Sequence, residues 1–184
     1  MSGTSDLTPV KEQFDLLVKL FPDAKKVAIL YCSSEINSKI QAKMAIDAAT
    51  ALGIETIETT VSSTNEIQQV VESLIGKVDA IYAPTDNVIA KAMPTVAMVA
   101  NANGIPVICG EKGMVDAGGL ATYGIDYYEL GVLTGEQAVK IIEGSATTAE
   151  MPIEYLSSED CTLTINKEVA AQLGIVIPED LIQE

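Results

Sequence analysis

The feature that most constrains the fold of this chain is an alternation of short apolar segments with longer segments of helical spacing, which covers the first two thirds of the sequence. The segments KVAILYC (26–32) and VDAIYA (78–83) are apolar almost throughout. A strand without polar alternation must be covered on both faces, which is typical of a parallel sheet. Strands that alternate with helices predict a doubly wound α/β fold.

Five strands are predicted, over residues 26–32, 54–61, 78–83, 105–109 and 120–123. Helices are predicted over 8–21, 36–52, 63–75 and 88–103, with a short one near 114–117. Gly53, Gly76 and Gly104 end three of these helices, as glycine commonly does. We expect the flavodoxin-like strand order 2-1-3-4-5, with 27–31 and 81–83 adjacent at the centre of the sheet.

Three local patterns refine the helices. Thr8 and Pro9 predict the N-cap and the first position of the first helix. Ile40, Met44 and Ala48 recur every four residues and predict the inner face of the helix over 36–52. In the helix over 88–103, Pro94 predicts a bend.

The last third departs from the alternation, so we expect a lobe at 1–124 and a hinge, helix and C-terminal tail at 125–184. The tail predicts a helix over 128–143, strands at 152–156 and 162–166 that do not continue the sheet, and a helix over 167–173. Side chains of the 128–143 helix form an apolar stripe: Leu130, Leu133, Ala138, Val139 and Ile142. The stripe predicts either fold-back beside the first helix or, preferably, a homodimer.

Composition removes several classes of function. With 26 acidic residues, 11 lysines and a net charge of -15, the surface repels nucleic acid. The chain has no His and no Arg, which excludes Ser-His-Asp catalysis and His-ligated zinc. We therefore predict no catalytic residues, no metal site and no cofactor. Cys32, Cys109 and Cys161 are predicted to be thiols outside any disulfide.

Ligands of open α/β sheets bind at the carboxyl ends of the strands. Four polar clusters occupy those positions: Ser33, Ser34, Asn37 and Ser38; Thr85, Asp86 and Asn87; Glu111; and Asp126 with Tyr127. The first cluster suits a carboxylate or phosphate at a helix N-terminus, and the carboxylates suit an ammonium group. Tyr127 offers an aromatic wall. Together the clusters predict a site for an α-amino acid or a similar zwitterion.

Each cluster also has a plain structural interpretation, as a helix cap, a capping turn or a solvated loop. A second class of function therefore stays open, in which the chain is a ligand-free flavodoxin-like scaffold or an interaction module.

Five stretches carry a family resemblance: GTSDLTPVKEQFDLL, KVAILYCSSEINS, VSSTNEIQQVVESLIGKVDAIYAPTDNVIA, IPVICGEKGMVDAGGLATYGIDYYELG and LTINKEVAAQLGIVIPEDL. They resemble the substrate-binding proteins of ABC importers, in the type I periplasmic-binding branch that binds tryptophan and other aromatic amino acids. The resemblance runs from about Gly3 to Ile182 and includes the S-S-E-x-N-S and P-T-D-N loops.

The resemblance implies a non-enzymatic, extracytoplasmic protein that closes two lobes around an amino acid and delivers it to an ABC permease. It implies the same ten ligand-binding residues as the four clusters. It also implies that this chain begins where the second lobe begins, as an engineered fragment, a truncated gene or one half of a split protein. Because the other lobe would supply half of the site, we expect residues 1–184 alone to bind weakly. Met1 to Pro9 lacks the pattern of a secretion signal, so we also expect this chain to stay in the cytoplasm.

Overall fold

A six-stranded sheet organises the main body of the chain in the computed structural model, which describes residues 2–156 and 160–182. The strands in spatial order are β3 (Glu55–Val61), β2 (Lys26–Cys32), β4 (Ala80–Ala83), β5 (Val107–Cys109), β6 (Ala121–Gly124) and β8 (Thr162–Ile165). The first five are parallel and have the predicted order 2-1-3-4-5. The predicted central pair is confirmed, because Val27 of β2 lies opposite Ala80 of β4.

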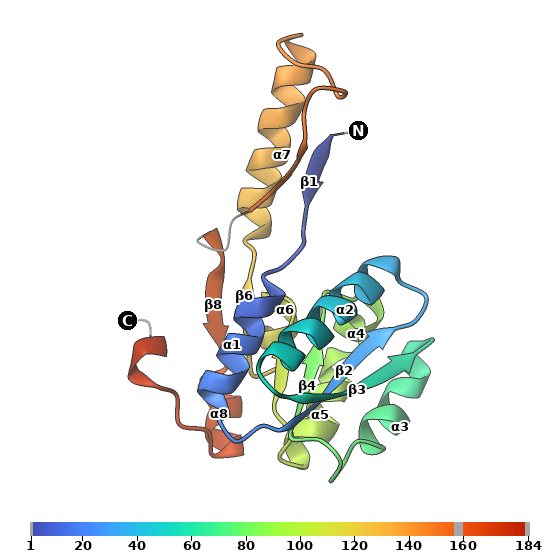
Figure 1. The fold of residues 1–184 in the computed structure, drawn as a ribbon, viewed down its shortest axis with the longest axis vertical. Helices are drawn as coiled ribbons and strands as arrows, with labels where there is room; N and C mark the ends of the chain where they lie inside the picture. The colour runs from blue at the N-terminus through green and yellow to red at the C-terminus, as the bar shows by residue number, and fades with distance from the viewer. Residues whose placement is uncertain (1, 157–159, 183–184) are drawn as a thin grey trace.

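Helices cover both faces of this sheet (Figure 1). One apolar cluster includes side chains of α1 (Val10–Leu20), α2 (Ile36–Ala51) and α8 (Lys167–Leu173). The other cluster includes side chains of four further helices: α3 (Ile67–Glu72), α4 (Asn87–Lys91), α5 (Met93–Ala102) and α6 (Lys112–Asp116). Alternate residues of β2 enter the two clusters, so KVAILYC is buried on both faces as its composition predicts.

Two prolines set helix boundaries. The helix expected over 88–103 is divided at Ala92 into α4 and α5, and Pro94 lies in the first turn of α5, where its missing N–H costs nothing. At the start of α1 the N-cap is Pro9, and no side chain caps the helix. The prediction that Thr8 caps this helix is therefore wrong.

The inner face of α2 differs from the prediction. Its buried residues are small or polar: Ser38, Gln41, Ala42, Ala45 and Ala49. Of the predicted stripe, Met44 and Ala48 are partly buried and pack against the core, but Ile40 is 55% exposed. Alanines let the helix backbone approach the sheet and α1 closely, and this packing overrides the hydrophobic pattern of the sequence.

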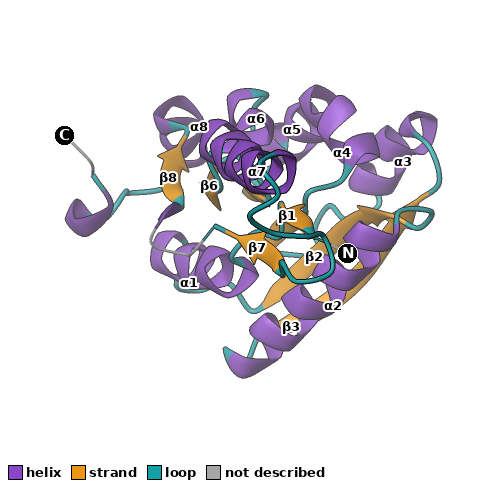
Figure 2. Cartoon of the chain, turned by 90° about the horizontal axis from the view of Figure 1, so that it is seen from above, coloured by secondary structure: helices purple, strands orange, loops and turns teal. Residues whose placement is uncertain are grey.

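Three elements project from the main body (Figure 1). Strands β1 (Gly3–Ser5) and β7 (Ile153–Tyr155) form a parallel pair beside α7 (Tyr127–Ile142), which Figure 2 shows from above. The hydroxyls of Thr4 in β1 and Thr134 in α7 are 2.6 Å apart. We call β1, α7 and β7 the arm. Helix α7 does not fold back beside α1, so the first alternative for its apolar stripe is not adopted.

The tail after the arm returns to the main body. Strand β8 pairs antiparallel with β6, with Thr162 opposite Gly124, so the expectation that the tail does not continue the sheet is wrong. An uncovered β6 would leave a row of unpaired backbone groups, and β8 satisfies them. Its alternate residues Leu163 and Ile165 pack against the core.

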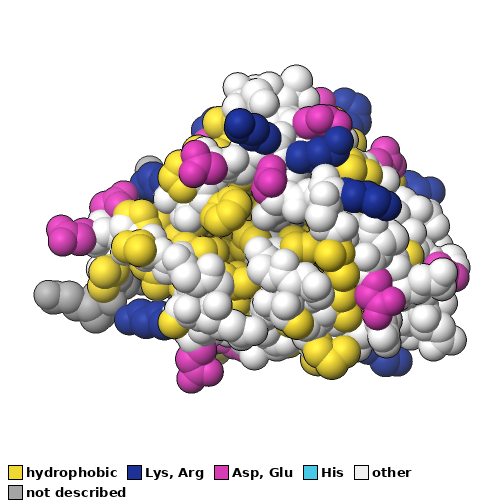
Figure 3. All heavy atoms as spheres, turned by 90° about the horizontal axis from the view of Figure 1, so that it is seen from below, with side chains coloured by type: hydrophobic (Ala, Val, Ile, Leu, Met, Phe, Trp, Pro, Cys, Tyr) yellow, Lys and Arg dark blue, Asp and Glu magenta, His cyan; other side chains and the backbone are white. Residues whose placement is uncertain are grey.

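Hydrophobic side chains also gather at the end of the molecule opposite the arm (Figure 3). A hollow of about 440 Å³ lies between the end of α1 and the segment after α8, and it is lined partly by Phe21, Ile175 and Val176. Among residues 2–156 and 160–182, no helix is long and apolar enough to cross a membrane.

Candidate functional site

Asp86 ties two segments together at the carboxyl edge of the sheet. It is 3% exposed, and its two oxygens accept hydrogen bonds from the backbone N–H of Cys32 at 2.7 Å and of Ile89 at 2.9 Å. The second bond caps α4. Within the described ranges no lysine forms an ion pair with this carboxylate. A buried negative charge without a cation is costly, so the position suits a cationic ligand group.

The loop after β4 is held against the first turns of α2. The Nδ2 of Asn37 donates to the carbonyl of Thr85 at 3.0 Å, and the N–H of Thr85 donates to Oε1 of Gln41 at 3.1 Å. The Nε2 of Gln41 donates in turn to the Thr85 hydroxyl. The carboxylate of Glu35 accepts from the backbone N–H and the side chain of Asn87. The first two polar clusters are therefore one connected unit.

The N-terminus of α2 lacks a side-chain cap, because Glu35 makes no capping hydrogen bond. Ser33 donates to the carbonyl of Val61 at 3.3 Å, and the Ser34 hydroxyl lies 3.1 Å from Sγ of Cys32. Ser38 is fully buried, and its hydroxyl has no partner among the described residues. An uncapped helix N-terminus beside a buried hydroxyl provides donors for an anionic group.

Glu111 and Asp126 cap helices. The Glu111 carboxylate accepts from the N–H of Gly113 at 2.6 Å and of Met114 at 2.9 Å, at the start of α6. Asp126 accepts from the N–H of Tyr128 at 2.7 Å, at the start of α7. Neither residue is therefore only a solvated loop acid or surface decoration, and each carboxylate keeps lone pairs for a further donor.

A cavity of about 410 Å³ brings Glu111 together with Asp126 and Tyr127 at the base of the arm. Tyr127 is half-exposed, and partial burial together with Asp6 and Glu111 raises its pKa to about 12. Its hydroxyl is therefore a neutral hydrogen-bond donor near neutral pH. Further lining residues that the sequence did not single out include Lys112, Asp116, Tyr128, Thr162 and Thr164.

Gly110 lies where the loop after β5 contacts the loop after β4. A Cβ at this position would lie 2.4 Å from the N of Thr85 and 2.6 Å from the carbonyl carbon of Pro84, so only glycine permits this approach. The N–H of Gly110 donates to the carbonyl of Ala83 at 2.7 Å. The loops that carry Thr85 and Glu111 are thus in contact.

Gln13 of α1 fixes the same region from below and was missed by the sequence analysis. It is fully buried, and its Nε2 donates to the carbonyls of Tyr123 at 2.7 Å and Gly110 at 3.1 Å. Its Oε1 accepts from the hydroxyl of Tyr82 at 2.7 Å. One glutamine therefore connects strands β4 and β6 with the loop at Gly110.

The four predicted clusters all lie at the edge of the sheet from which the arm leaves, in two groups joined at Gly110. Among the described residues no group of three or more His, Cys, Asp or Glu side chains could hold a metal ion. In open α/β sheets ligands bind at this edge, so a doubly wound sheet with polar loops there is typical of ligand-binding α/β proteins.

The family described as "ABC transporter substrate binding protein" matches residues 1–184, and the chain belongs to this family. It is a family of solute-binding proteins in the type I periplasmic-binding fold.

Two relatives with related ligands and one ligand-free structure are similar to it. The chain is 40% identical to a tyrosine-binding protein of Clostridioides difficile, over 95% of this chain and 50% of the relative. It is 39% identical to the crystal structure of an ABC domain in complex with L-Trp from Streptococcus pneumonia, with a TM-score of 0.90 over 98% of this chain and 60% of that one. A ligand-free, open substrate-binding protein with adhesive properties from Clostridium difficile is 40% identical, with a TM-score of 0.78 over 97% of this chain and 60% of that one. The chain therefore spans only half to three fifths of the length of these relatives.

Proposed function

We propose that this chain forms one ligand-binding lobe of a two-lobed importer protein and that its ligand is an aromatic amino acid such as tryptophan, tyrosine or phenylalanine. The L-Trp complex and the tyrosine-binding relative support the ligand class. The observation that carries the proposal is the buried, cation-free carboxylate of Asp86 beside the uncapped N-terminus of α2. These two features complement the ammonium and carboxylate groups of an amino acid.

We assign roles on that basis. The carboxylate of the ligand would contact the start of α2, through Ser33, Ser34, Asn37 and Ser38. Its ammonium group would face Thr85, Asp86, Asn87, Glu111 and Asp126. Tyr127 would contact the aromatic ring, since its half-exposed side chain lines the cavity at the base of the arm.

The proposed division of the chain is a lobe at 1–124 and a crossing segment at 125–184. In a two-lobed protein, the exposed apolar side chains of α7, such as Val132, Val139 and Ile142, would contact the other lobe. Where that lobe is not present, a second copy of the chain would cover them as a homodimer. The two-lobed protein would act outside the cytoplasm and deliver its ligand to an ABC permease.

Calorimetric titration with L-Trp, L-Tyr and L-Phe, with L-Leu as the control ligand, tests the proposal. We expect weak or undetectable binding to residues 1–184 and tight binding once the chain is joined to the remaining lobe of a relative, because two lobes bury the ligand from both sides. If neither form binds an amino acid, the proposal is wrong and a ligand-free scaffold or interaction module is the better account.

Asp86 gives the sharper test, in the two-lobed protein. Asp86→Ala is expected to weaken ligand binding by about 2–5 kcal/mol if the carboxylate pairs with the ammonium group in a dry site. Because Asp86 also caps α4, Asp86→Asn serves as the comparison, since its amide oxygen can keep the cap at Ile89 while the charge and the acceptor for the N–H of Cys32 are lost. Unchanged affinity in both variants would remove Asp86 from the site.

A further inference from the structure

The topological switch point of the main sheet lies between β2 and β4. These strands are hydrogen-bonded neighbours, but the helices that follow them leave toward opposite faces of the sheet. Side chains of α2 belong to one apolar cluster, and Ile89 of α4 belongs to the other. Ligands of open α/β sheets bind outside the carboxyl ends of the strands at such a point. The loops after β2 and β4 are therefore the expected contacts of a ligand.

Two carboxylates connect these loops in opposite directions. Asp86, which precedes α4, accepts from the N–H of Cys32 in β2 at 2.7 Å. Glu35, which precedes α2, accepts from the N–H and from the Nδ2 of Asn87 at 3.2 and 3.1 Å. Asp86 is 3% exposed, whereas Glu35 is only partly buried. Glu35 is therefore the more accessible of the two acids at the switch point.

The hydrogen bonds of the Glu35 carboxylate end on one of its oxygens. Oε2 accepts from both donors of Asn87, and Oε1 accepts no hydrogen bond from the residues that the structure describes. Glu35 is the N-cap residue of α2, but its side chain makes no capping hydrogen bond there. The carboxylate is thus held in place by one oxygen, and the lone pairs of the other are available to a further donor.

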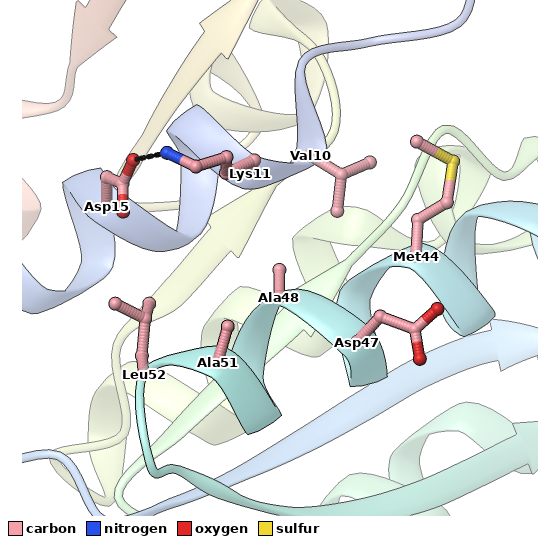
Figure 4. Close-up of a pocket in the computed structure, with 8 residues that line it drawn as sticks. All are labelled: Val10, Lys11, Asp15, Met44, Asp47, Ala48, Ala51 and Leu52. Carbon is pink, nitrogen blue, oxygen red and sulfur yellow. Dashed lines mark hydrogen bonds and ion pairs between the residues drawn. The ribbon is translucent and has the colours of Figure 1, made fainter.

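Among residues 2–156 and 160–182, no lysine forms an ion pair with Glu35. Elsewhere, lysines and aspartates four residues apart do pair: Lys11 with Asp15, Lys43 with Asp47, and Lys112 with Asp116. Figure 4 shows the first pair at the rim of an apolar cavity of about 330 Å³ between α1 and α2. Lys39 follows Glu35 at the same spacing without pairing to it. The charge of Glu35 is therefore left for a cation that these residues do not supply.

Donors for an anionic group lie directly beside this acid. The N–H groups at the start of α2 have no side-chain cap, and the buried Ser38 hydroxyl in the same turn has no partner among the described residues. An α-amino acid carries its ammonium and carboxylate groups on one carbon atom, so its site needs an acceptor and donors close together. The start of α2 provides both, with Glu35 as the acceptor.

We propose that Glu35 is a further ligand-binding residue, whose free oxygen accepts a hydrogen bond from the α-ammonium group of the ligand and thereby selects compounds with a free amino group. This assignment rests on the proposed function, in which the ligand is an aromatic amino acid. An ammonium group has three N–H donors, so it can bind Glu35 and Asp86 together. Hydrogen bonds between two charged groups are stronger than neutral ones, so the contact contributes to selectivity.

Two ligands separate charge recognition from a structural role. L-Trp carries both charged groups, and 3-indolepropionate has the same ring and carboxylate but no ammonium group. Glu35→Gln keeps an oxygen for the two donors of Asn87 and removes the charge. Both ligands are titrated by calorimetry into the chain alone and into the two-lobed protein. We expect Glu35→Gln to weaken L-Trp binding by about 10- to 100-fold and 3-indolepropionate binding by less than about 2-fold.

Asp79→Asn is the matched control. Asp79 is also partly buried, and its carboxylate accepts two hydrogen bonds, from the N–H of Lys25 at 2.8 Å and of Lys26 at 2.9 Å. It directly precedes β4, so it lies at the opposite edge of the sheet. The same change from acid to amide should there leave the binding of both ligands unchanged. Thermal unfolding without ligand verifies that both variants fold.

The outcomes distinguish this inference from the proposed function. If Glu35→Gln binds L-Trp as wild type does, Glu35 only anchors Asn87 and the inference is wrong. Equal losses for L-Trp and 3-indolepropionate would also overturn it, because the residue would then shape the site without contacting the ammonium group. Both results leave the proposed function intact. A wild-type protein that binds neither ligand, alone or with the second lobe, would overturn the proposed function and this inference together.

Discussion

The main body and the arm differ in how they bury apolar surface. In the main body, every residue of β2 after Lys26 is buried, and helices cover both faces of the sheet. In the arm, α7 buries only Leu130 and Gln137, while Val132, Val139 and Ile142 are exposed. The main body therefore buries a core of its own, whereas the arm leaves most apolar side chains of α7 exposed.

The largest expected difference between the two regions is the effect of truncating an aliphatic side chain. Leu30→Ala in β2 should lower the free energy of unfolding by about 3–5 kcal/mol, because the side chain is fully buried in a packed core. Val139→Ala in α7 should change it by less than about 0.5 kcal/mol, because half of that side chain is exposed. Urea denaturation of both variants measures the contrast. Equal losses would mean that the arm is as tightly packed as the main body.

The buried hydrogen bonds of Gln13 are expected to contribute to the stability of the main body. Gln13→Leu should lower the free energy of unfolding by about 2–3 kcal/mol, since it leaves the Tyr82 hydroxyl and the Tyr123 carbonyl without their partner. Adding Tyr82→Phe should recover part of the loss, because the unpaired donor is removed as well. A double variant less stable than the sum of the two single variants would contradict this interpretation.

Replacing glycine by alanine is expected to have opposite effects on stability in the two regions. Gly110→Ala should destabilise the chain by about 1–3 kcal/mol, because its Cβ would meet the backbone at Pro84 and Thr85. Gly131 lies in α7, and a Cβ there would meet nothing within 4 Å. Gly131→Ala should stabilise α7 by about 0.5–1 kcal/mol through helix propensity. Thermal unfolding of both variants tests the pair, and a stabilising Gly110→Ala would exclude the close loop contact.

The smallest effect concerns pH. Burial, together with the hydrogen bond to Glu58, raises the pKa of Tyr31 to about 12, and burial with Asp6 and Glu111 raises that of Tyr127 to about 12. Both pKa values lie above the ordinary value of 10.0, so the stability they contribute is complete below pH 10 and is lost as pH rises toward 12.

Urea denaturation across this alkaline range provides the measurement. Tyr31→Phe should reduce the alkaline loss of stability more than Tyr127→Phe, since Tyr31 is nearly buried and Tyr127 is half-exposed. An equal reduction would show that the base of the arm is as shielded from water as the main sheet.

Much of the fold could be predicted because apolar strands and glycine stops are local signals. The order of the five parallel strands follows from connection rules, and the sequence also predicted that Cys32 and Cys109 are buried without a disulfide. The position of β8 could not be predicted, because its partner β6 is distant in sequence. The inner face of α2 was predicted only in part: Met44 and Ala48 pack against the core, whereas Ile40 is exposed because alanines pack closest to the sheet.

The candidate site was predictable at the level of loops, because the carboxyl ends of parallel strands meet at one edge. Its supporting residues were not. Gln13 and Gln41 are buried hydrogen-bonding residues on helices, and in sequence they resemble solvent-exposed glutamines. A glutamine flanked by small or apolar residues on the inner face of a helix is the signal that could have identified them.

The pairing of β6 with β8 has a mechanical consequence. Gly124 at the base of the arm lies opposite Thr162, and Tyr123 lies opposite Leu163, so the arm is attached through the last rungs of the sheet. The Tyr123 carbonyl is bound by Gln13, which also holds the carbonyl of Gly110. A rotation of the arm that twisted those rungs would therefore strain the hydrogen bonds of Gln13, which also binds the loop that touches Thr85. Gln13 thus provides a direct connection between the base of the arm and this loop.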